Sequence, residues 1–165
     1  MFEQMINRFS GSMTGSTIQK VYWKEWGAAF GIALLPVMLA SIPPFLDPIG
    51  RALVMRVFEP LCHQMPSRSP HVWGVQLAVG HRVYGILMGF PLGAIFFAAL
   101  VRQDSVLQRW APQIVAAAAL PMAVDWALGW MGLWANTPLS RMFTGALFGV
   151  VAGYWLTRAI LQALR

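Results

Sequence analysis

The stretch "VYGILMGFPLGAIFFAALV", residues 83–101, contains no charged side chain over 19 positions. Because a helix of roughly 20 apolar residues spans the hydrocarbon core of a bilayer, this stretch predicts a transmembrane helix. Residues 26–46 form a second charge-free window, of 21 positions. Two shorter windows, 110–124 and 142–157, become long enough only if their helices continue past Asp125 and Arg158. We expect four transmembrane helices, with the long aliphatic stem of Arg158 carrying its charge to the membrane surface.

The composition supports this fold class, an all-α polytopic membrane protein. Hydrophobic residues make up 58% of the 165 positions and charged residues only 11%, with a net charge of +6. The positive charges lie singly or in pairs between apolar runs. That pattern is typical of loops that face lipid headgroups, and it argues against a nucleic-acid partner.

The spacing of the windows predicts the domain organisation. A polar N-terminal arm over residues 1–22 precedes a single transmembrane domain over residues 23–165, with helices over about 23–45, 82–101, 110–134 and 141–162 and a polar loop over 47–81. Within this loop, "DPIGRALVMRVFEP" (47–60) places Ile49, Leu53, Val57 and Phe58 on one face. Such a face predicts a short helix lying in the membrane interface.

The distribution of Lys and Arg favours one orientation. With the N-terminus inside, the inner segments hold seven of these residues and the outer segments five. Cytoplasmic segments of membrane proteins are enriched in Lys and Arg. We therefore expect a multi-pass protein of the cell membrane with both termini in the cytoplasm.

Polar residues gather on one side of the membrane. Because successive crossings alternate, the loop after the first helix and the turn after the third open on the same side. The candidate site comprises Cys62, His63, Gln64, Arg68, Ser69, His81, Arg82, Asp125, Asn136 and Arg141. A carboxylate inside a membrane helix costs about 2.5–3.5 kcal/mol on insertion scales, so Asp125 needs a partner, either Arg82 or Arg141. A structural ion pair is the simpler interpretation, and a proton carrier or ligand-orienting group is the alternative.

A metal site is a weaker hypothesis. The possible ligands are Cys62, His63, His71 and His81, but their spacing matches no standard zinc pattern. A haem would need only an axial ligand such as His81. We expect no bound cofactor, and zinc and haem stay open as alternatives. A nucleophilic Cys62 would need a base, His71 or His81, oriented by Asp125.

Two glycine ladders and a tryptophan stripe indicate packing surfaces. Glycines recur every fourth position in two segments: Gly85, Gly89 and Gly93, then Gly145, Gly149 and Gly153. Small residues at this spacing let helix backbones approach closely within a bilayer. Trp126, Trp130 and Trp134 also lie four apart, which predicts one aromatic face. We expect this face to pack or to contact lipid; if it points outward, a partner protein, a quinone or a pigment ring could cover it.

Four motifs together resemble a family of small predicted membrane proteins of unknown function. They are "CHQMPSRS" (62–69), "RVYGI" (82–86), "PMAVD" (121–125) and "RMFTGALFG" (141–149), and the family typically reads CHQxPxRS, CxRCxGI, PxxxDGxxQ and RxxTGxxxG. The resemblance implies a fold without a chemistry. Where the family has two further cysteines this chain has Gly80 and Val83, and where it has glycine and glutamine after the aspartate this chain has Trp126 and Gly129. Three cysteines and a histidine would suit zinc or thiol chemistry in the family, and two of those sulfurs are missing here.

Two functional hypotheses follow. The favoured one is a non-catalytic subunit that docks within a larger membrane complex beside other integral membrane subunits, such as an electron-transfer or photosynthetic assembly. The alternative is a small membrane enzyme or binding protein with a polar site formed by residues 62–82 and the turn between the third and fourth helices.

Overall fold

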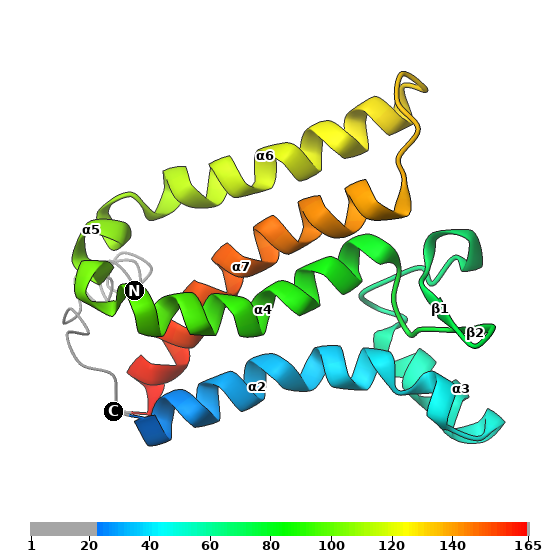
Figure 1. Ribbon diagram of the computed structural model, residues 1–165, viewed down its shortest axis with the longest axis horizontal. Helices are drawn as coiled ribbons and strands as arrows, with labels where there is room; N and C mark the ends of the chain where they lie inside the picture. Colours follow the sequence, from blue (N-terminus) through cyan, green and yellow to red (C-terminus); the bar gives the residue numbers. More distant parts are fainter. Residues whose placement is uncertain (1–22, 165) are drawn as a thin grey trace, which may run out of the picture.

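The computed structural model describes residues 23–164, which are mostly helical (Figure 1). The predicted N-terminal arm, residues 1–22, lies outside the described residues. The elements in chain order are α2 (Trp23–Ser41), η1 (Pro43–Phe45), α3 (Pro48–Phe58), η2 (Pro66–Arg68), β1 (His71–Val72), β2 (Val75–Gln76), α4 (His81–Leu100), η3 (Val101–Gln103), α5 (Asp104–Arg109), α6 (Ala111–Trp130) and α7 (Pro138–Ala163).

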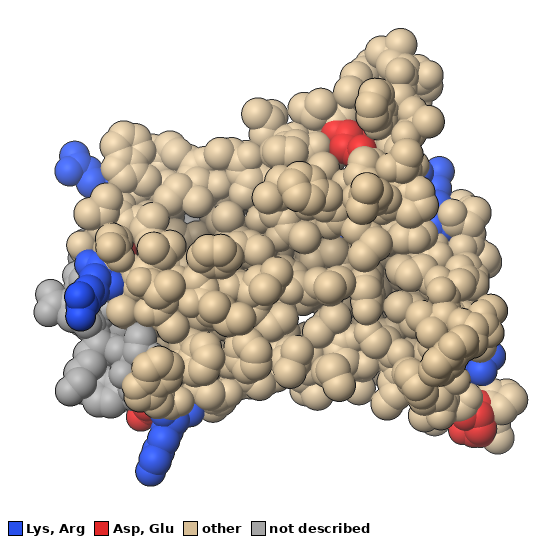
Figure 2. Space-filling view, viewed as in Figure 1, with Lys and Arg blue, Asp and Glu red and all other residues tan. Residues whose placement is uncertain are grey.

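Within residues 23–164, three helical stretches are long and apolar enough to cross a membrane. They are His81–Arg109, Ala111–Trp130 and Pro138–Ala163. The fourth predicted span, α2, does not meet the same criteria over its described 19 residues, and its first turn carries Lys24 and Glu25. Figure 2 shows Lys and Arg side chains at the two ends of the long axis, with a broad band without them in between. This distribution is the one expected when the long axis runs across a bilayer.

Two of the predicted helix ends were wrong for local reasons. The first helix was expected to reach residue 45, but α2 ends at Ser41 and Pro43–Phe45 form a 3₁₀ turn. Proline lacks the N–H that would continue the α-helical ladder. The third helix was expected to reach residue 134, but α6 ends at Trp130. Gly132 follows with a φ of 71°, the left-handed conformation that commonly terminates a helix.

The last helix begins earlier than predicted. It was expected to start at residue 141, but α7 starts at Pro138. Thr137 caps it, because its side-chain oxygen accepts a hydrogen bond from the N–H of Ser140 at 3.1 Å. Threonine at the cap followed by proline in the first turn is a favoured helix start.

Helices α4 and α7 form the central pair of the molecule, and their glycines lie at the contact. A Cβ added to Gly85 would collide with the backbone of Met142, and one added to Gly149 would collide with the backbone of Ile86. The same holds for the other four glycines of the two ladders, each of which faces backbone atoms of the opposite helix. The two backbones are therefore close enough to exclude any side chain at these positions.

Helix α2 lies along the opposite side of α4 from α6 (Figure 1). Near one end, the indole N–H of Trp26 donates to the carbonyl of Ala94 at 2.9 Å. Near the other end, the hydroxyls of Ser41 and Tyr84 are 2.9 Å apart. Helix α6 packs chiefly on α7, so it covers only one side of the central pair.

Asp104, in the segment between α4 and α6, forms a buried ion pair with Arg158 of α7 that the sequence analysis missed. Asp104 is fully buried, and both of its carboxylate oxygens accept from Nε of Arg158 at 3.1 Å. Tyr154 donates its hydroxyl to the same carboxylate at 3.1 Å. Arg158 therefore pairs with Asp104 inside the protein, and the sequence analysis did not assign it this partner.

The segment 47–81 is more ordered than an irregular loop. Asp47 caps α3 by accepting from the N–H groups of Ile49 and Gly50, at 3.3 and 3.2 Å. Ile49, like Leu53 and Val57, is more than half exposed, but Phe58 is buried in the core and does not share their outer face. A two-residue antiparallel hairpin, β1 and β2, pairs His71 with Gln76 and adds a strand element that an all-α prediction omits.

Candidate functional site

The two predicted halves of the candidate site meet at one end of the helices, where α4 and α7 begin and α6 ends (Figure 1). Asp125 of α6 accepts a charge-assisted hydrogen bond from Arg82 of α4. Of the two arginines offered by the sequence, Arg82 is therefore the partner. The carboxylate side chain is 7% exposed, so the pair is a mostly buried link between α4 and α6, across α7.

Asn136, in the turn before α7, completes the surroundings of Asp125. Its side-chain nitrogen donates to the backbone carbonyl of Asp125 at 2.8 Å and to the carboxylate at 3.1 Å. A Cβ at Gly129 would overlap the amide of Asn136. The glycine at position 129 therefore makes room for the asparagine, and the sequence analysis gave no role to this position.

Two cavities adjoin this pair. The larger, about 290 Å³, is lined by residues from the 61–65 segment, from η2, from the start of α4 and from α6 and α7: Leu61, Cys62, His63, Gln64, Met65, Arg68, Gly80, His81, Arg82, Val83, Trp126 and Arg141. The smaller, about 130 Å³, lies beside it and shares Arg68, Arg82, Trp126 and Arg141. We call these two cavities together the arginine pocket. Trp126, beside Asp125 in the chain, is a lining residue that the sequence analysis did not include.

The arginine pocket carries an excess of positive charge. Three guanidinium groups, those of Arg68, Arg82 and Arg141, line it. With the carboxylate of Asp125, which pairs with Arg82, these side chains carry a net charge of +2 when the histidines are neutral. The side chains of Arg68 and Arg141 make no hydrogen bond or ion pair with any residue in the range 23–164. Nε of Arg82 is buried, and it too has no partner among those residues. Such donors are what a bound anion would satisfy.

Gln64 holds the wall of the pocket in place. Its side-chain nitrogen donates to the backbone carbonyls of Met55 and Ala78, at 2.6 and 2.9 Å. Its backbone carbonyl accepts from the side-chain nitrogen of Gln76 at 2.7 Å. The φ of Gln64 is 48°, a left-handed conformation that is uncommon for residues other than glycine. Gln64 therefore fastens the 62–69 segment to α3 and to the hairpin, which is a structural task.

Ser69 and the nearby histidines have similar structural roles. Ser69 is buried; its hydroxyl donates to the carbonyl of Met65 at 3.0 Å, and its backbone carbonyl lies 3.0 Å from Nδ1 of His71. Nδ1 of His81 lies 2.7 Å from the carbonyl of Arg68. The ring of His81 thus fixes the backbone that carries the Arg68 side chain toward the pocket.

A catalytic triad built on Cys62 is not formed. The sulfur of Cys62 accepts from the N–H of Gly80 at 3.2 Å. The carboxylate of Asp125 pairs with Arg82 and Asn136, and neither His71 nor His81 bonds to it. Within residues 23–164, no three His, Cys, Asp or Glu side chains are grouped as metal ligands. Of the four candidate metal ligands, Cys62, His63 and His81 line the larger cavity and His71 lies outside it.

The tryptophan stripe is shorter than predicted. Trp126 and Trp130 stack on α6 with ring centroids 6.4 Å apart and an interplanar angle of 9°. Trp134 lies beyond the end of the helix, so the three rings do not form one continuous helical face. Both stacked rings are more than half exposed, and they form the outer wall of the pocket.

The fold and this pocket define a class, a mostly helical membrane protein with several apolar helices and a polar, positively charged end. A family model described as "Predicted membrane protein (DUF2085)" matches residues 62–155, and the chain belongs to that family. Uncharacterized protein MJ1492 of Methanocaldococcus jannaschii is 30% identical over 102 residues, which cover 61% of this chain and 64% of that relative. The match therefore spans slightly less than two thirds of the relative's length. No solved structure matches the chain.

Proposed function

We propose that the chain is an integral membrane protein that binds an anionic group in the arginine pocket at one membrane surface. One observation carries the proposal: Arg68, Arg82 and Arg141 come from three separate segments to line one pocket, and of the three only Arg82 pairs with a carboxylate, that of Asp125, within residues 23–164. Guanidinium groups held close together repel one another, and an anion that accepts hydrogen bonds from them would offset this repulsion. A volume of about 290 Å³ is near the lower limit for a small-molecule site and suits one charged group.

Binding, and not catalysis, is the role that these contacts support. The groups that a nucleophilic mechanism would use are engaged with backbone atoms: Cys62 with the N–H of Gly80, and His81 with the carbonyl of Arg68. A general base must reach the proton that it removes. In the described part of the chain, neither His71 nor His81 is hydrogen-bonded to the thiol of Cys62.

A panel of anions tests this function. The full chain in mild detergent is heated with phosphate, sulfate, acetate or chloride at equal ionic strength. We expect phosphate to raise the unfolding temperature most, because ligands that bind only the folded state stabilise it. Arg141→Gln should abolish the rise, and Arg56→Gln, on the exposed surface of α3, should retain it. An equal response of both variants to phosphate would contradict the proposal.

The proposal includes four membrane crossings with both termini in the cytoplasm. Helix α2 supplies the fourth crossing, supported by its position along α4 and by the hydrogen bond from Trp26 to Ala94. In this orientation the arginine pocket faces away from the cytoplasm. Ser67→Cys in a Cys62→Ser background should therefore react with a membrane-impermeant maleimide in intact cells. Labelling only after the cells are broken would reverse the orientation.

A second candidate function is that of a subunit in a larger membrane complex. The observation that favours it is the exposure of α6, which packs chiefly on α7 and leaves Trp126 and Trp130 on the outside. A transmembrane helix of another integral membrane chain could cover this face. Gentle solubilisation followed by mass measurement tests it: a stoichiometric partner that Trp130→Ala releases would support the subunit, and a chain that runs alone would exclude it.

A further inference from the structure

We infer that the anion held by the arginine pocket is the phosphate of a membrane lipid whose acyl chain lies against α7, between α4 and α6. This inference rests on the proposed function, because it names the ligand class of the same pocket. The observation that suggests it is a second, purely apolar cavity, lined by the same three helices and by Leu107 of α5, further along α7 from the arginine pocket.

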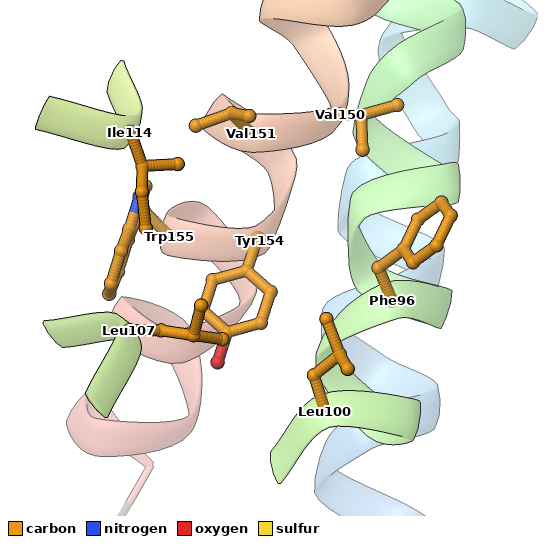
Figure 3. A pocket seen from close by; sticks show the side chains of 8 residues that line it. All are labelled: Phe96, Leu100, Leu107, Ile114, Val150, Val151, Tyr154 and Trp155. Carbon is orange, nitrogen blue, oxygen red and sulfur yellow. The ribbon is translucent and has the colours of Figure 1, made fainter. Parts of the chain in front are cut away.

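This apolar cavity has a volume of about 170 Å³. Figure 3 shows Phe96 and Leu100 of α4 on one side and Leu107, Ile114 and Trp155 on the other. The remaining lining residues, Val150, Val151 and Tyr154, belong to α7. The described residues contribute no polar surface to the cavity, so they offer nothing to a water molecule or to a soluble metabolite. Hydrocarbon is the chemistry that fits it.

The two sites are separated by about the depth of one lipid layer. Arg141 and Val151 both lie on α7, ten residues apart. At a rise of 1.5 Å per residue this spacing is about 15 Å, which is half of the roughly 30 Å hydrocarbon core of a bilayer. A lipid with its phosphate beside Arg141 would therefore place the end of an acyl chain at the near edge of the apolar cavity, at Val150 and Val151.

The arginine pocket is also accessible from the side that would face lipid. Trp126 lines both of its cavities and is 58% exposed, and its neighbour in the stack, Trp130, is 79% exposed. Tryptophan is enriched at the level of lipid headgroups. Because α6 packs chiefly on α7, a lipid can reach the arginines past these rings without leaving the membrane.

Charge selects the class of lipid. With two guanidinium groups unpaired and a net charge of +2, the pocket complements a phosphate that is not neutralised by its own headgroup. Phosphatidic acid and phosphatidylglycerol satisfy this condition. Phosphatidylcholine does not, because its quaternary ammonium would lie among the arginines.

Native mass spectrometry of the full chain, released from nanodiscs of phosphatidylcholine with a minor share of phosphatidylglycerol, tests the inference. We expect the wild-type chain to retain phosphatidylglycerol out of proportion to its share. In the double variant Arg68→Gln, Arg141→Gln, the retained phosphatidylglycerol should fall at least about tenfold, because each charge-assisted contact contributes roughly that factor or more to the affinity. Arg56→Gln is the matched control and should behave as wild type, and circular dichroism verifies that each variant stays helical.

Two further arms separate the lipid from the bare anion. Val151→Trp fills the near edge of the apolar cavity, so it should weaken binding of the long-chain lipid and leave binding of glycerol 3-phosphate unchanged. If glycerol 3-phosphate binds the wild type as tightly as the lipid does, or if Val151→Trp has no effect on the lipid, the lipid inference is overturned and the anion site stands. If neither ligand binds, both the inference and the proposed function fail.

Discussion

Arg158 donates from Nε to both carboxylate oxygens of Asp104, 3.1 Å away, across 54 positions of sequence. The pair fixes α5 against the last third of α7 and lies at the end of the molecule opposite the arginine pocket (Figure 1). Asp104 is fully buried and also accepts from Tyr154. Each end of the α4–α7 pair therefore has one ion pair between a carboxylate and an arginine: Asp125 with Arg82 at one end and Asp104 with Arg158 at the other.

Removing one charge of this pair should be strongly destabilising. Asp104→Asn would leave the guanidinium of Arg158 buried without a counter-charge, and breaking such pairs costs about 3–5 kcal/mol. Thermal unfolding in detergent measures the loss. Asp47→Asn, at the exposed cap of α3, is the control and should cost about 1 kcal/mol or less. Equal losses for the two variants would mean that the pair does not hold α5 in place.

The close contact between α4 and α7 predicts that alanine substitutions at two helical glycines will have different effects on stability. Gly149→Ala adds a Cβ that would overlap the backbone of Ile86, so we expect the two helices to separate. Gly31→Ala, in α2, adds a Cβ that meets nothing within 4 Å and should be neutral or stabilising by up to about 1 kcal/mol. The midpoint of unfolding distinguishes the two. Similar midpoints would contradict the close approach of α4 and α7.

The link between Arg82 and Asp125 should be visible as an energetic coupling. Arg82→Gln and Asp125→Asn each leave the other residue without its partner, and the double variant removes both charges. We expect the double variant to be more stable than the sum of the single changes predicts, by about 0.5–3 kcal/mol. A double-mutant cycle on unfolding free energies measures this coupling. Additive effects would show that the two side chains act independently.

Position 80 lies close enough to Cys62 to be bridged to it. A Cβ built on Gly80 would be 3.6 Å from the sulfur of Cys62. A disulfide brings each Cβ somewhat closer than this to the partner's sulfur, with the two Cβ atoms about 3.5–4.5 Å apart, so a small shift should let Gly80→Cys form one under mild oxidation. Titration of free thiols should then give none for this variant. Ser67→Cys, an exposed position, is the control and should keep both thiols reactive. If Gly80→Cys keeps two free thiols, positions 62 and 80 lie further apart than in this structure.

Three of the four spans and the gathering of polar residues at one end could be predicted from sequence, because charge-free windows and alternating crossings depend on composition and order alone. From sequence, the partner of Asp125 could be narrowed only to Arg82 or Arg141, since both are predicted near the start of a helix on the same side of the membrane. The pairing of Asp104 with Arg158 could not be predicted. Nothing in either local pattern reports a contact between residues 54 positions apart.

The roles of individual site residues were also hidden from the sequence. Cys62, Gln64 and His81 suggested chemistry by their residue types, yet their hydrogen bonds go to backbone atoms of Gly80, Ala78 and Arg68. Such bonds depend on loop conformation, including the positive φ of Gln64, and no periodicity predicts it. The pattern of residue types did predict correctly that the 62–82 segment and the turn before α7 meet at one end of the helices.

Direct binding of a short-chain phosphatidylglycerol to the full chain, by titration calorimetry in neutral detergent, tests the central claim most directly. The arginine pocket predicts saturable binding at one lipid per chain that weakens with salt, because the contact is between charges. It also predicts that Arg141→Gln loses at least about tenfold in affinity while Arg141→Lys recovers part of it, since lysine keeps the charge without the planar fork. Binding that is unsaturable, or that Arg141→Gln and Arg56→Gln reduce equally, would contradict the claim.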